Sequence, residues 1–396
     1  MILLTGATGF LGKKILSKLL VDKDIRIISL VIRATSQAHA RERIIEILEE
    51  KFSAGEISEL LGKIHLLPGD VTEDKLGLTE NDYLQASKSL STIYHCAAST
   101  ALNQSKTCAE KINIQGTKQV IELARCAAQE GRRISLHHVS TAYVAGDTDG
   151  VVTPEALNLK GSFRNHYEYS KALSEKLVRD VSTEINTRIY RPSIIIGDSN
   201  TGHTSAFNVL YVPAKFIVKG LFHALPAIPH TPFDVVPVNY VADAILKLSE
   251  LNAPSGKCYH LSAGLGRETS PKEILECIIT ALELYKHRNY LGVRKLTFLT
   301  PEMLSLLSSS LNLALQGVIN FERFYAKRLD IFKQTLPFLP YMMRNPQFDT
   351  SATITDLDGK LSLPPLFTQY ADKIFGFCLE TNWGKLPIKQ ARLSAV

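Results

Sequence analysis

Short apolar runs alternate with segments of helical periodicity over the first two-thirds of the chain. The apolar runs predict strands at Ile2–Thr5, Ile25–Ile32, Ile64–Pro68, Thr92–Cys96, Ile134–Val139 and Arg188–Ile196. Apolar residues at helical spacing predict helices at Lys13–Leu20, Ala40–Phe52, Ile112–Ala128 and Tyr169–Val181. Continuous apolar strands that alternate with helices are typical of a parallel sheet covered on both faces. We therefore predict an α/β chain with a Rossmann-type, doubly wound parallel sheet, which binds its ligands at the carboxyl ends of the strands.

The pattern changes after Gly197, where proline becomes frequent. Two further apolar runs, Val235–Val238 and Cys258–Ser262, are expected to return to the sheet, with a helix at Ala242–Leu251 between them. From about Arg267 onward the chain looks helical. The sequence therefore predicts a dinucleotide-binding domain over residues 1–265, with a substrate-side insertion at about 200–234, and a smaller, mainly helical substrate region over residues 266–396.

Composition narrows the class of protein. The hydrophobic fraction of 45% and the charged fraction of 21% are ordinary for a soluble globular protein. The net charge of +6 is mild and no long Lys/Arg block occurs, so a nucleic-acid binder is not expected. The six cysteines form no CxxC pair and no zinc-type cluster with His, so they are interpreted as reduced thiols without a metal site. The sequence shows neither an apolar stretch of about 18 residues nor a signal-peptide layout, which favours a cytoplasmic protein without a transmembrane segment.

The first strand runs into a glycine turn, Thr5-Gly6-Ala7-Thr8-Gly9-Phe10-Leu11-Gly12, which a predicted helix follows. This context is the one that a dinucleotide-binding turn requires. Gly6 permits the tight turn, Gly9 lets the backbone approach a pyrophosphate, and Gly12 allows close helix–strand packing. The N–H groups at the start of the helix then face the phosphates. Because they share this turn, Thr8, Phe10 and Leu11 are counted with the three glycines as cofactor-binding residues.

The end of the second strand indicates which dinucleotide binds. Turns that bind NAD place an acidic residue there for the ribose 2′-hydroxyl. This chain has no carboxylate in that stretch and carries Arg33, with Arg43 as a second candidate. A guanidinium binds a phosphate through charge-assisted, bidentate hydrogen bonds. The sequence therefore favours NADP(H), although Arg33 could also be an ordinary surface arginine beyond a strand.

Tyr167 and Lys171 form a Tyr-x-x-x-Lys pair, which places both side chains on one face of a helix. A tyrosine with a pKa of about 10 is a poor acid–base catalyst at neutral pH. A neighbouring ammonium and a positively charged nicotinamide ring would lower that pKa by stabilising the phenolate. In the reductive direction Tyr167 would donate a proton to a carbonyl oxygen, and Lys171 would also hold the nicotinamide ribose. Tyr169 is the rival tyrosine, but its spacing to Lys171 puts it on another face.

A third catalytic group is expected at the end of the preceding strand. Ser140 and Thr141 supply two adjacent hydroxyls there. One of them would hydrogen-bond the substrate carbonyl and polarise it. We favour Thr141 and keep Ser140 as the alternative; a third interpretation is that the pair merely ends a strand.

These motifs together resemble the extended short-chain dehydrogenase/reductase superfamily. The likeness is greatest to its thioester-reductase branch, which includes fatty acyl-CoA reductases and the reductase domains of carboxylic acid reductases and peptide synthetases. The segments that carry it are Thr5–Gly12, Leu30–Arg33, Gly69–Thr72, His95–Ala98, Asn113–Thr117, His138–Val144, Tyr167–Lys171, Arg191–Ser193 and Val236–Ala242. The likeness covers roughly the first 265 residues and weakens beyond them.

The resemblance implies further cofactor-binding residues. They are Asp70 and Val71 beside the adenine, Ala97 and Ala98 along the cofactor, Asn113 steadying the neighbouring loop, and Pro192 and Ser193 near the nicotinamide. Judged from the residues alone, Asp70 could be only a turn residue and Asn113 only the start of a helix.

The reaction that the resemblance implies is hydride transfer from NADPH to an acyl thioester, presented by coenzyme A or an acyl-carrier protein. A hemithioacetal would collapse to an aldehyde and a thiol, and a second hydride would give the alcohol. The apolar segment Val209–Pro229 and the tail Met303–Met343 could wall an acyl tunnel, but ordinary core packing explains them equally well. Aromatic and basic residues between Phe321 and Lys333 leave open a peripheral membrane contact, although a docked helix is favoured. A homodimer is compatible with the chain.

Two alternatives remain open at this stage. The same catalytic trio serves reductases, dehydrogenases and epimerases of free ketones or alcohols, such as steroids and nucleotide sugars. A non-catalytic NADP(H) sensor is the alternative from another class, but such proteins usually lack the tyrosine or the lysine, and both are present here.

Overall fold

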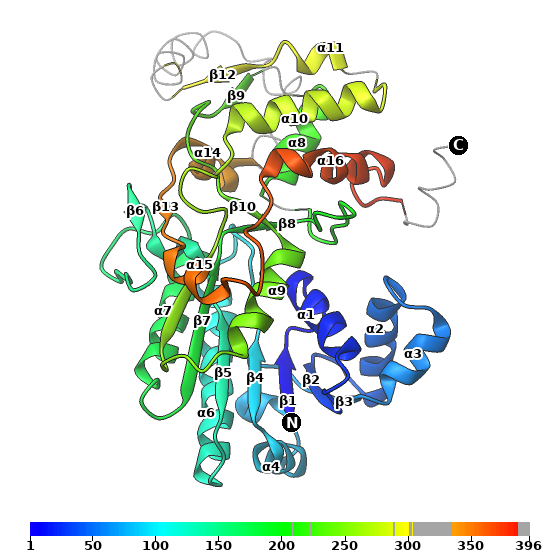
Figure 1. Cartoon of the computed structure of the whole chain (residues 1–396), viewed down its shortest axis with the longest axis vertical. Helices are drawn as coiled ribbons and strands as arrows, with labels where there is room; N and C mark the ends of the chain where they lie inside the picture. Colours follow the sequence, from blue (N-terminus) through cyan, green and yellow to red (C-terminus); the bar gives the residue numbers. More distant parts are fainter. Residues whose placement is uncertain (208, 222–223, 288–289, 301–302, 304–334, 387–396) are drawn as a thin grey trace, which may run out of the picture.

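A parallel sheet forms the centre of the lower part of the molecule in Figure 1. The computed structural model describes residues 1–207, 209–221, 224–287, 290–300, 303 and 335–386. The seven strands of this sheet have the order β11-β7-β5-β4-β1-β2-β3 and pair in parallel throughout. They are β1 (Ile2–Thr5), β2 (Ile28–Ile32), β3 (Ile64–Pro68), β4 (Thr92–His95), β5 (Ser135–Val139), β7 (Asn186–Pro192) and β11 (Lys257–Leu261). The Rossmann-type fold is thus confirmed, and its strand order reverses between β1 and β4, where such sheets bind ligands.

Helices cover both faces of the sheet, and each face has its own apolar core. Adjacent residues of β1 point to opposite faces of the sheet, so Leu4 packs in one core and Leu3 in the other. The first core includes residues of α1 (Phe10–Val21), α2 (Gln37–Glu49), α3 (Ala54–Leu61) and α9 (Val238–Ser249). The second includes residues of α4 (Glu80–Ser89), α6 (Gly116–Gln129) and α7 (His166–Asp180). The short α5 (Lys106–Ala109) precedes α6.

Besides the four-residue α5, two helices of the first half were missed by the periodicity. Ser53 and Glu56 form a capping box at the start of α3, and the Thr79 side chain accepts the Asp82 N–H at the start of α4. These polar caps satisfy backbone N–H groups that a helix otherwise leaves free. Neither helix is long, so few apolar positions reveal it.

The expectation that Val235–Val238 returns to the main sheet is wrong. The run forms β10 (Val235–Pro237), which pairs with β8 (Ile194–Ile196) in a separate two-stranded sheet. The predicted strand Arg188–Ile196 therefore divides at Pro192, which has no backbone N–H. The N–H of Ile194 binds the carbonyl of Asp234 instead, and the chain leaves the main sheet there.

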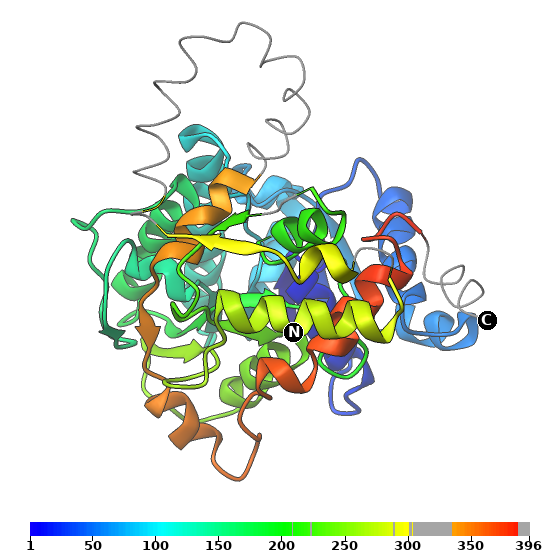
Figure 2. The ribbon, with the colours of Figure 1, turned by 90° about the horizontal axis from the view of Figure 1, so that it is seen from above.

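The later segments form a second lobe, in the upper part of Figure 1, with a core of its own. Figure 2 shows α10 and α16 crossing the top of the molecule side by side. The helices are α8 (Tyr211–Val218), α10 (Pro271–Leu284), α11 (Tyr290–Val293), α14 (Leu339–Met343) and α16 (Ala371–Glu380). The late helix α15 (Ser351–Leu357) instead packs beside β11 and α9, and its Leu357 belongs to the first core of the main sheet. Two short strand pairs, which the sequence did not predict, tie this region to earlier parts of the chain: β9 (Ala224–Pro226) with β12 (Thr297–Leu299), and β6 (Val151–Val152) with β13 (Gln347–Phe348).

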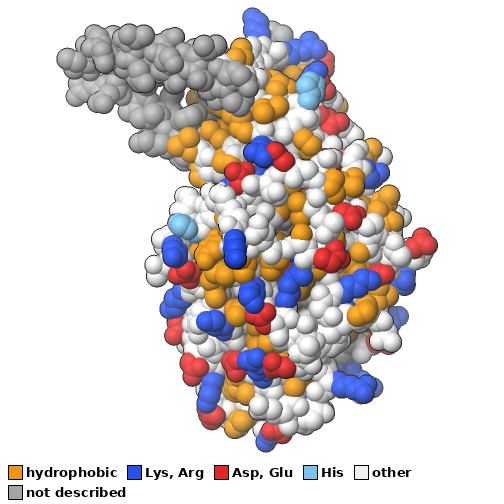
Figure 3. All heavy atoms as spheres, turned by 90° about the vertical axis from the view of Figure 1, so that its left-hand side faces the viewer, with side chains coloured by type: hydrophobic (Ala, Val, Ile, Leu, Met, Phe, Trp, Pro, Cys, Tyr) orange, Lys and Arg blue, Asp and Glu red, His pale blue; other side chains and the backbone are white. Residues whose placement is uncertain are grey.

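The boundary near residue 265 stays a prediction. Most of the tail Met303–Met343, including the aromatic and basic residues from Phe321 to Lys333, lies outside the described residues. Where the chain is described, no helix is both long and apolar enough to cross a membrane. The face drawn in Figure 3 carries cationic and anionic side chains interspersed with apolar atoms.

Candidate active site

The turn between β1 and α1 accepts only glycine at two of its positions. Gly6 has a φ of +74°, a conformation that residues with a Cβ rarely adopt. A Cβ there would also lie 2.6 Å from the backbone nitrogen of Ala97, and a Cβ on Gly12 would overlap the carbonyl oxygen of Gly6. Gly9 is the N-cap of α1 and provides no side-chain cap. The first N–H groups of α1 therefore remain available to an anionic group.

A cleft opens at this turn, at the carboxyl ends of β1 to β4. Its lining residues are Gly6, Thr8, Gly9, Val31, Ile32, Arg33, Arg43, Gly69, Asp70, Val71, Thr72, Cys96, Ala97, Ala98 and Ile112. Nine of the proposed cofactor-binding residues are among them. Phe10, Leu11 and Gly12 are not, because they belong to α1 and face the apolar core or the turn.

Two arginines lie at the rim of this cleft, where β2 ends. Arg33 is exposed, and Arg43 of α2 is half-buried. Arg43 donates to the carbonyl oxygen of Arg33, and its second terminal nitrogen lies 3.5 Å from Oγ1 of Thr8. Arg43 is thus held between the glycine turn and the end of β2, and two guanidinium groups stand beside the cleft with no acidic residue in its lining except Asp70.

Asn113 lies behind the cleft rather than in its wall. It is buried, its Oδ1 accepts the N–H of Ser99 at 2.8 Å, and its Nδ2 donates to the Ser99 carbonyl at 3.1 Å. The same Nδ2 donates to the hydroxyl of Ser170 at 2.8 Å. Asn113 therefore links the loop after β4 to helix α7.

Tyr167 and Lys171 lie on α7, which begins at His166. Lys171 is buried, and its Nζ donates to the carbonyl of Val139 at the end of β5, at 2.7 Å. Burial lowers the pKa of Lys171 to about 8, while Glu175 and Cys96 favour its charged form. Because Cys96 also lines the cleft, the ammonium stands next to the region assigned to the cofactor.

The protein's own groups shift the pKa of Tyr167 upward. Burial raises it to about 12, and a hydrogen bond with Thr141 opposes only part of that rise. The protein by itself therefore does not lower this pKa, because desolvation of the phenolate outweighs the stabilising groups around it. Tyr167 is consequently protonated at neutral pH, which is the form that can donate a proton.

The two hydroxyls at the end of β5 have different partners. Ser140 donates to Oε2 of Glu175 at 2.7 Å. That carboxylate is buried and also binds Arg191 through both of its oxygens, at 2.9 and 2.7 Å. Thr141 is the residue that pairs with Tyr167, and its Oγ1 lies 3.4 Å from the carbonyl of Pro192. The geometry thus favours Thr141 over Ser140 as the third catalytic group.

The pair of Glu175 and Arg191 was missed by the sequence reading. Both side chains are buried, and Arg179 also binds Glu175. Burial raises the pKa of Glu175, but Arg191, Arg179 and Ser140 together reverse this and hold it below its usual range. Next to this pair, Pro192 ends β7, and the N–H of Ser193 donates to the Leu261 carbonyl at 3.1 Å. No local motif marks such a pair, since it depends on how α7 packs on β7.

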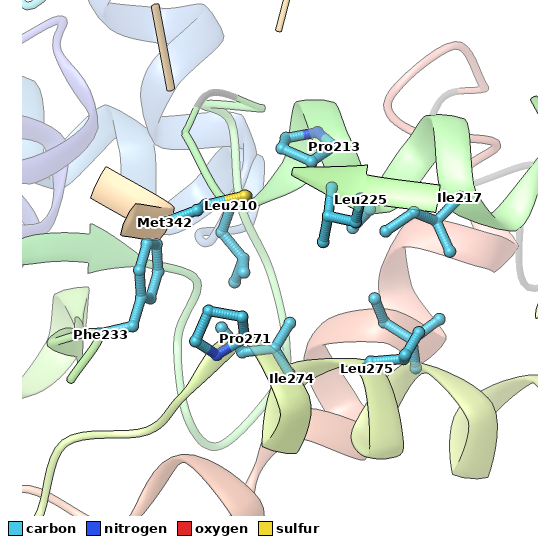
Figure 4. Close-up of a pocket in the computed structure, with 11 residues that line it drawn as sticks. Leu210, Pro213, Ile217, Leu225, Phe233, Pro271, Ile274, Leu275 and Met342 are labelled. Atoms are coloured by element: carbon cyan, nitrogen blue, oxygen red, sulfur yellow. The ribbon is translucent and has the colours of Figure 1, made fainter. Parts of the chain in front are cut away.

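An apolar cavity lies in the upper lobe, between α8, β9, α10 and α14. Figure 4 shows its side chains pointing toward one another from these elements. The lining residues are Leu210, Pro213, Ala214, Ile217, Leu225, Phe233, Pro271, Ile274, Leu275, Ile278 and Met342. Its volume of about 20 Å³ is room for about one water molecule. The walls would have to move apart before an apolar ligand could enter.

The described residues contain no group of three or more His, Cys, Asp or Glu side chains that could hold a metal ion. The site is therefore considered in terms of its hydroxyls, its lysine and the dinucleotide cleft.

Comparison with curated proteins finds relatives of two kinds. Fatty acyl-CoA reductase 1 of Mus musculus is 30% identical over 278 residues, which cover 62% of this chain and 53% of the relative. Fatty acyl-CoA reductase 2 of Homo sapiens is 25% identical over 300 residues, covering 66% of this chain and 58% of the relative. Nonribosomal peptide synthetase asaC of Aspergillus flavus is 29% identical over 271 residues, covering 66% of this chain and 26% of the synthetase. The chain thus spans a little over half the length of these reductases and about a quarter of the synthetase.

Solved structures share the fold over nearly the whole chain. The terminal R domain from the myxalamid PKS-NRPS biosynthetic pathway has a TM-score of 0.76 and 24% identity, covering 98% of this chain and 92% of that domain. UDP-glucuronic acid 4-epimerase from Bacillus cereus in complex with NAD has a TM-score of 0.60 and 16% identity, covering 95% and 99%. Identities this low show the fold alone. A family model described as male sterility protein matches residues 4–245, more than half of the 396 residues. The chain therefore belongs to the male sterility protein family, and this confirms the resemblance to extended short-chain dehydrogenases/reductases of the thioester-reductase branch.

Proposed function

We propose that the chain is an NADPH-dependent reductase of acyl thioesters, which it converts to an aldehyde or an alcohol. The observation that carries the proposal is the meeting of Tyr167, Thr141 and Lys171 at the carboxyl edge of the sheet, beside the glycine-turn cleft. The named relatives, fatty acyl-CoA reductases and a peptide synthetase, support a thioester as the substrate.

The residues present suit a nicotinamide dinucleotide. Gly6 and Gly12 form a cradle in which a Cβ would collide, and the uncapped start of α1 faces the cleft. The choice of NADP(H) within this cofactor class rests on Arg33 and Arg43, whose guanidinium groups would bind the 2′-phosphate. When bound, NADPH supplies the hydride.

The chain's own residues would handle the oxygen of the substrate carbonyl. Tyr167 donates its proton to that oxygen as negative charge develops on it. Thr141, paired with Tyr167, donates a second hydrogen bond to the same oxygen. Lys171 would hold the nicotinamide ribose, and its charge stabilises the phenolate that Tyr167 becomes when it gives up its proton.

The binding site for the acyl chain is proposed from the apolar cavity of the upper lobe. The walls of the apolar cavity come from Leu210, α8, Leu225, Phe233, α10 and Met342, so the cavity is the place where an acyl chain would insert once its walls separate. Coenzyme A or an acyl-carrier protein would present the thioester. A cytoplasmic location and a homodimer are retained as predictions.

NADPH consumption by purified protein, followed by absorbance, tests the proposal. The panel contains acyl-CoAs of graded chain length, with aldehydes and ketones alongside, and Tyr167→Phe is assayed in parallel. Turnover of a thioester that Tyr167→Phe abolishes is the expected result. Turnover of ketones alone would replace the proposal by a carbonyl reductase, and tight NADPH binding without any turnover, including that of carrier-bound thioesters, would favour a sensor.

A further inference from the structure

Tyr341 connects the C-terminal region to the start of the catalytic helix. It belongs to α14, 173 residues after Glu168 in the sequence, and its side chain is buried. Its hydroxyl donates to Oε1 of Glu168 at 2.7 Å and accepts from Nδ2 of Asn165 at 2.9 Å. Both partners belong to the first turn of α7, where Tyr167 also lies. One hydroxyl group therefore bridges two distant parts of the chain next to the proposed proton donor.

Glu168 is a buried carboxylate with several partners at this point. Its Oε2 accepts the N–H of Arg164 at 3.0 Å, and Oε1 lies 3.6 Å from Nη1 of the same arginine. Asn165 caps α7 by accepting the Glu168 N–H at 3.0 Å. Burial raises the pKa of Glu168, while Tyr341 and Arg164 favour its charged form. A buried carboxylate is costly unless its oxygens are bonded, so the hydrogen bond from Tyr341 fixes the geometry of this turn.

The ring of Tyr341 also contacts the loop that carries Thr141. Tyr143 packs edge-on against it, with ring centroids 5.0 Å apart and an angle of 84°. The backbone N–H of Tyr143 donates to Oγ1 of Thr141 at 3.3 Å, so the residue that carries this ring is hydrogen-bonded to the proposed oxygen-binding residue. The Arg164 guanidinium lies 5.1 Å from the Tyr341 ring and 6.0 Å from the Tyr143 ring. Tyr341 thus touches both elements that supply catalytic side chains.

The next residue of α14 faces the apolar cavity. Met342 lines it beside Phe233 and Leu210, as Figure 4 shows. Its carbonyl oxygen accepts the N–H of Ile228 at 3.0 Å. A movement of α14 that opened the cavity would therefore be transmitted through Tyr341 to the first turn of α7.

We propose that Tyr341 is a positioning residue, which acts through Glu168 and Tyr143 to align Tyr167 and Thr141 with the α14 wall of the acyl cavity. No sequence pattern predicts this role, because Tyr341 lies beyond the family motifs. The kinetic consequence rests on the proposed thioester reduction, whereas the structural link does not.

Tyr341→Phe is the direct test, because it removes the hydroxyl and keeps the ring. Tyr370→Phe is the matched control: that tyrosine is also buried in the upper lobe, and its hydroxyl has no hydrogen-bond partner in the described part of the chain. Because Glu168 would lose a charge-assisted hydrogen bond, we expect kcat for an acyl-CoA to fall about tenfold in Tyr341→Phe. The dissociation constant for NADPH should stay within about twofold of wild type, as should all parameters of Tyr370→Phe.

Two outcomes of the kinetic experiment would overturn the proposal. One is a kcat for Tyr341→Phe equal to that of Tyr370→Phe. The other is a parallel loss of NADPH affinity and thermal stability, which would indicate a merely structural role. Glu168→Gln leaves only one side-chain oxygen to accept from Tyr341 and Arg164, so it should lower kcat by a factor similar to that of Tyr341→Phe, with the dissociation constant for NADPH again within about twofold of wild type.

Amide hydrogen exchange tests the link without any enzyme assay. In Tyr341→Phe, exchange should accelerate both in α14 and in the first turn of α7, and in Tyr370→Phe it should accelerate in neither. Equal exchange at the start of α7 in the two variants would refute the link. If the wild type reduces no thioester but exchange responds as expected, the proposed function fails and the link stands.

Discussion

The starts of α1 and α7 both belong to the candidate site, but the chain completes them in opposite ways. At α1, Gly9 offers no capping side chain, and the first N–H groups face the cleft. At α7, the Asn165 side chain caps the helix, and Glu168 binds both Arg164 and Tyr341. The first helix leaves its initial N–H donors to a ligand, whereas the second uses the Glu168 N–H and its polar side chains in contacts within the protein.

The start of α1 is therefore suited to binding the cofactor, and the start of α7 to the chemical step. An uncapped helix start attracts an anionic group, and here the adjacent arginines would favour a phosphate. A helix start whose polar side chains are hydrogen-bonded holds the neighbouring side chains in fixed directions. A proton donor needs such a fixed direction to meet a carbonyl oxygen. Substitutions at the two helices should therefore affect different constants, and the following predictions test this separation.

The largest effect is expected from Tyr167→Phe, which removes the proton donor at the α7 side. General acid catalysis contributes about 10²–10⁴-fold, so kcat should fall about 10³-fold. Binding of NADPH, measured by fluorescence titration, should not change by more than about twofold. Tyr169→Phe on the same helix is the control, and a comparable loss in that variant would contradict the assignment.

Gly12→Ala, at the α1 side, should have the reverse effect and change NADPH binding more than kcat. Its Cβ would overlap the carbonyl of Gly6, so the turn and the start of α1 must move apart. A misplacement of about 1 Å can cost about 100-fold, and we expect the dissociation constant for NADPH to rise by about that factor. Gly55→Ala is the matched control, because nothing lies within 4 Å of a Cβ there. Unchanged NADPH binding in Gly12→Ala would show that the turn is not part of the cofactor site.

Arg33→Ala sharpens the comparison by identifying the anion. Loss of a charge-assisted hydrogen bond to the 2′-phosphate should weaken NADPH binding about 10- to 100-fold and leave NADH binding unchanged. Arg41→Ala, an exposed arginine of α2 outside the cleft, is the control. Equal losses for both cofactors would show that Arg33 does not select the phosphate.

The two regions also differ in how well the sequence predicts them. The glycine turn, Arg33 and the Tyr167–Lys171 pair are motifs of a few residues, and the alternating pattern placed the seven strands of the main sheet. The residues that line the cleft at the glycine turn could therefore be predicted, except that Leu11 and Gly12 pack behind the cleft rather than line it.

The substrate side could not be predicted in this way. Tyr341 contacts Glu168 across 173 positions, and β13 pairs with β6, only two residues long. Contacts of such separation leave no periodicity in the sequence. The rise in the pKa of Tyr167 within the protein alone could not be predicted for a related reason, since its burial depends on the assembled fold rather than on its helical neighbour.

The smallest effect should come from pH, through Lys171. Burial lowers its pKa to about 8, so the side chain is charged below that pH and loses its proton as the pH rises through it. Tyr167, with a pKa of about 12, remains protonated over this range and adds no step of its own. At pH 9 about one lysine in ten would be charged, and kcat should be about tenfold lower than its plateau near pH 7. Lys171→Arg keeps its charge and should move this loss to higher pH, even if its overall rate is lower. If kcat of Lys171→Arg falls at the same pH as in the wild type, the titration belongs to another group. The contribution of α7 would then be the proton of Tyr167 without the charge of Lys171.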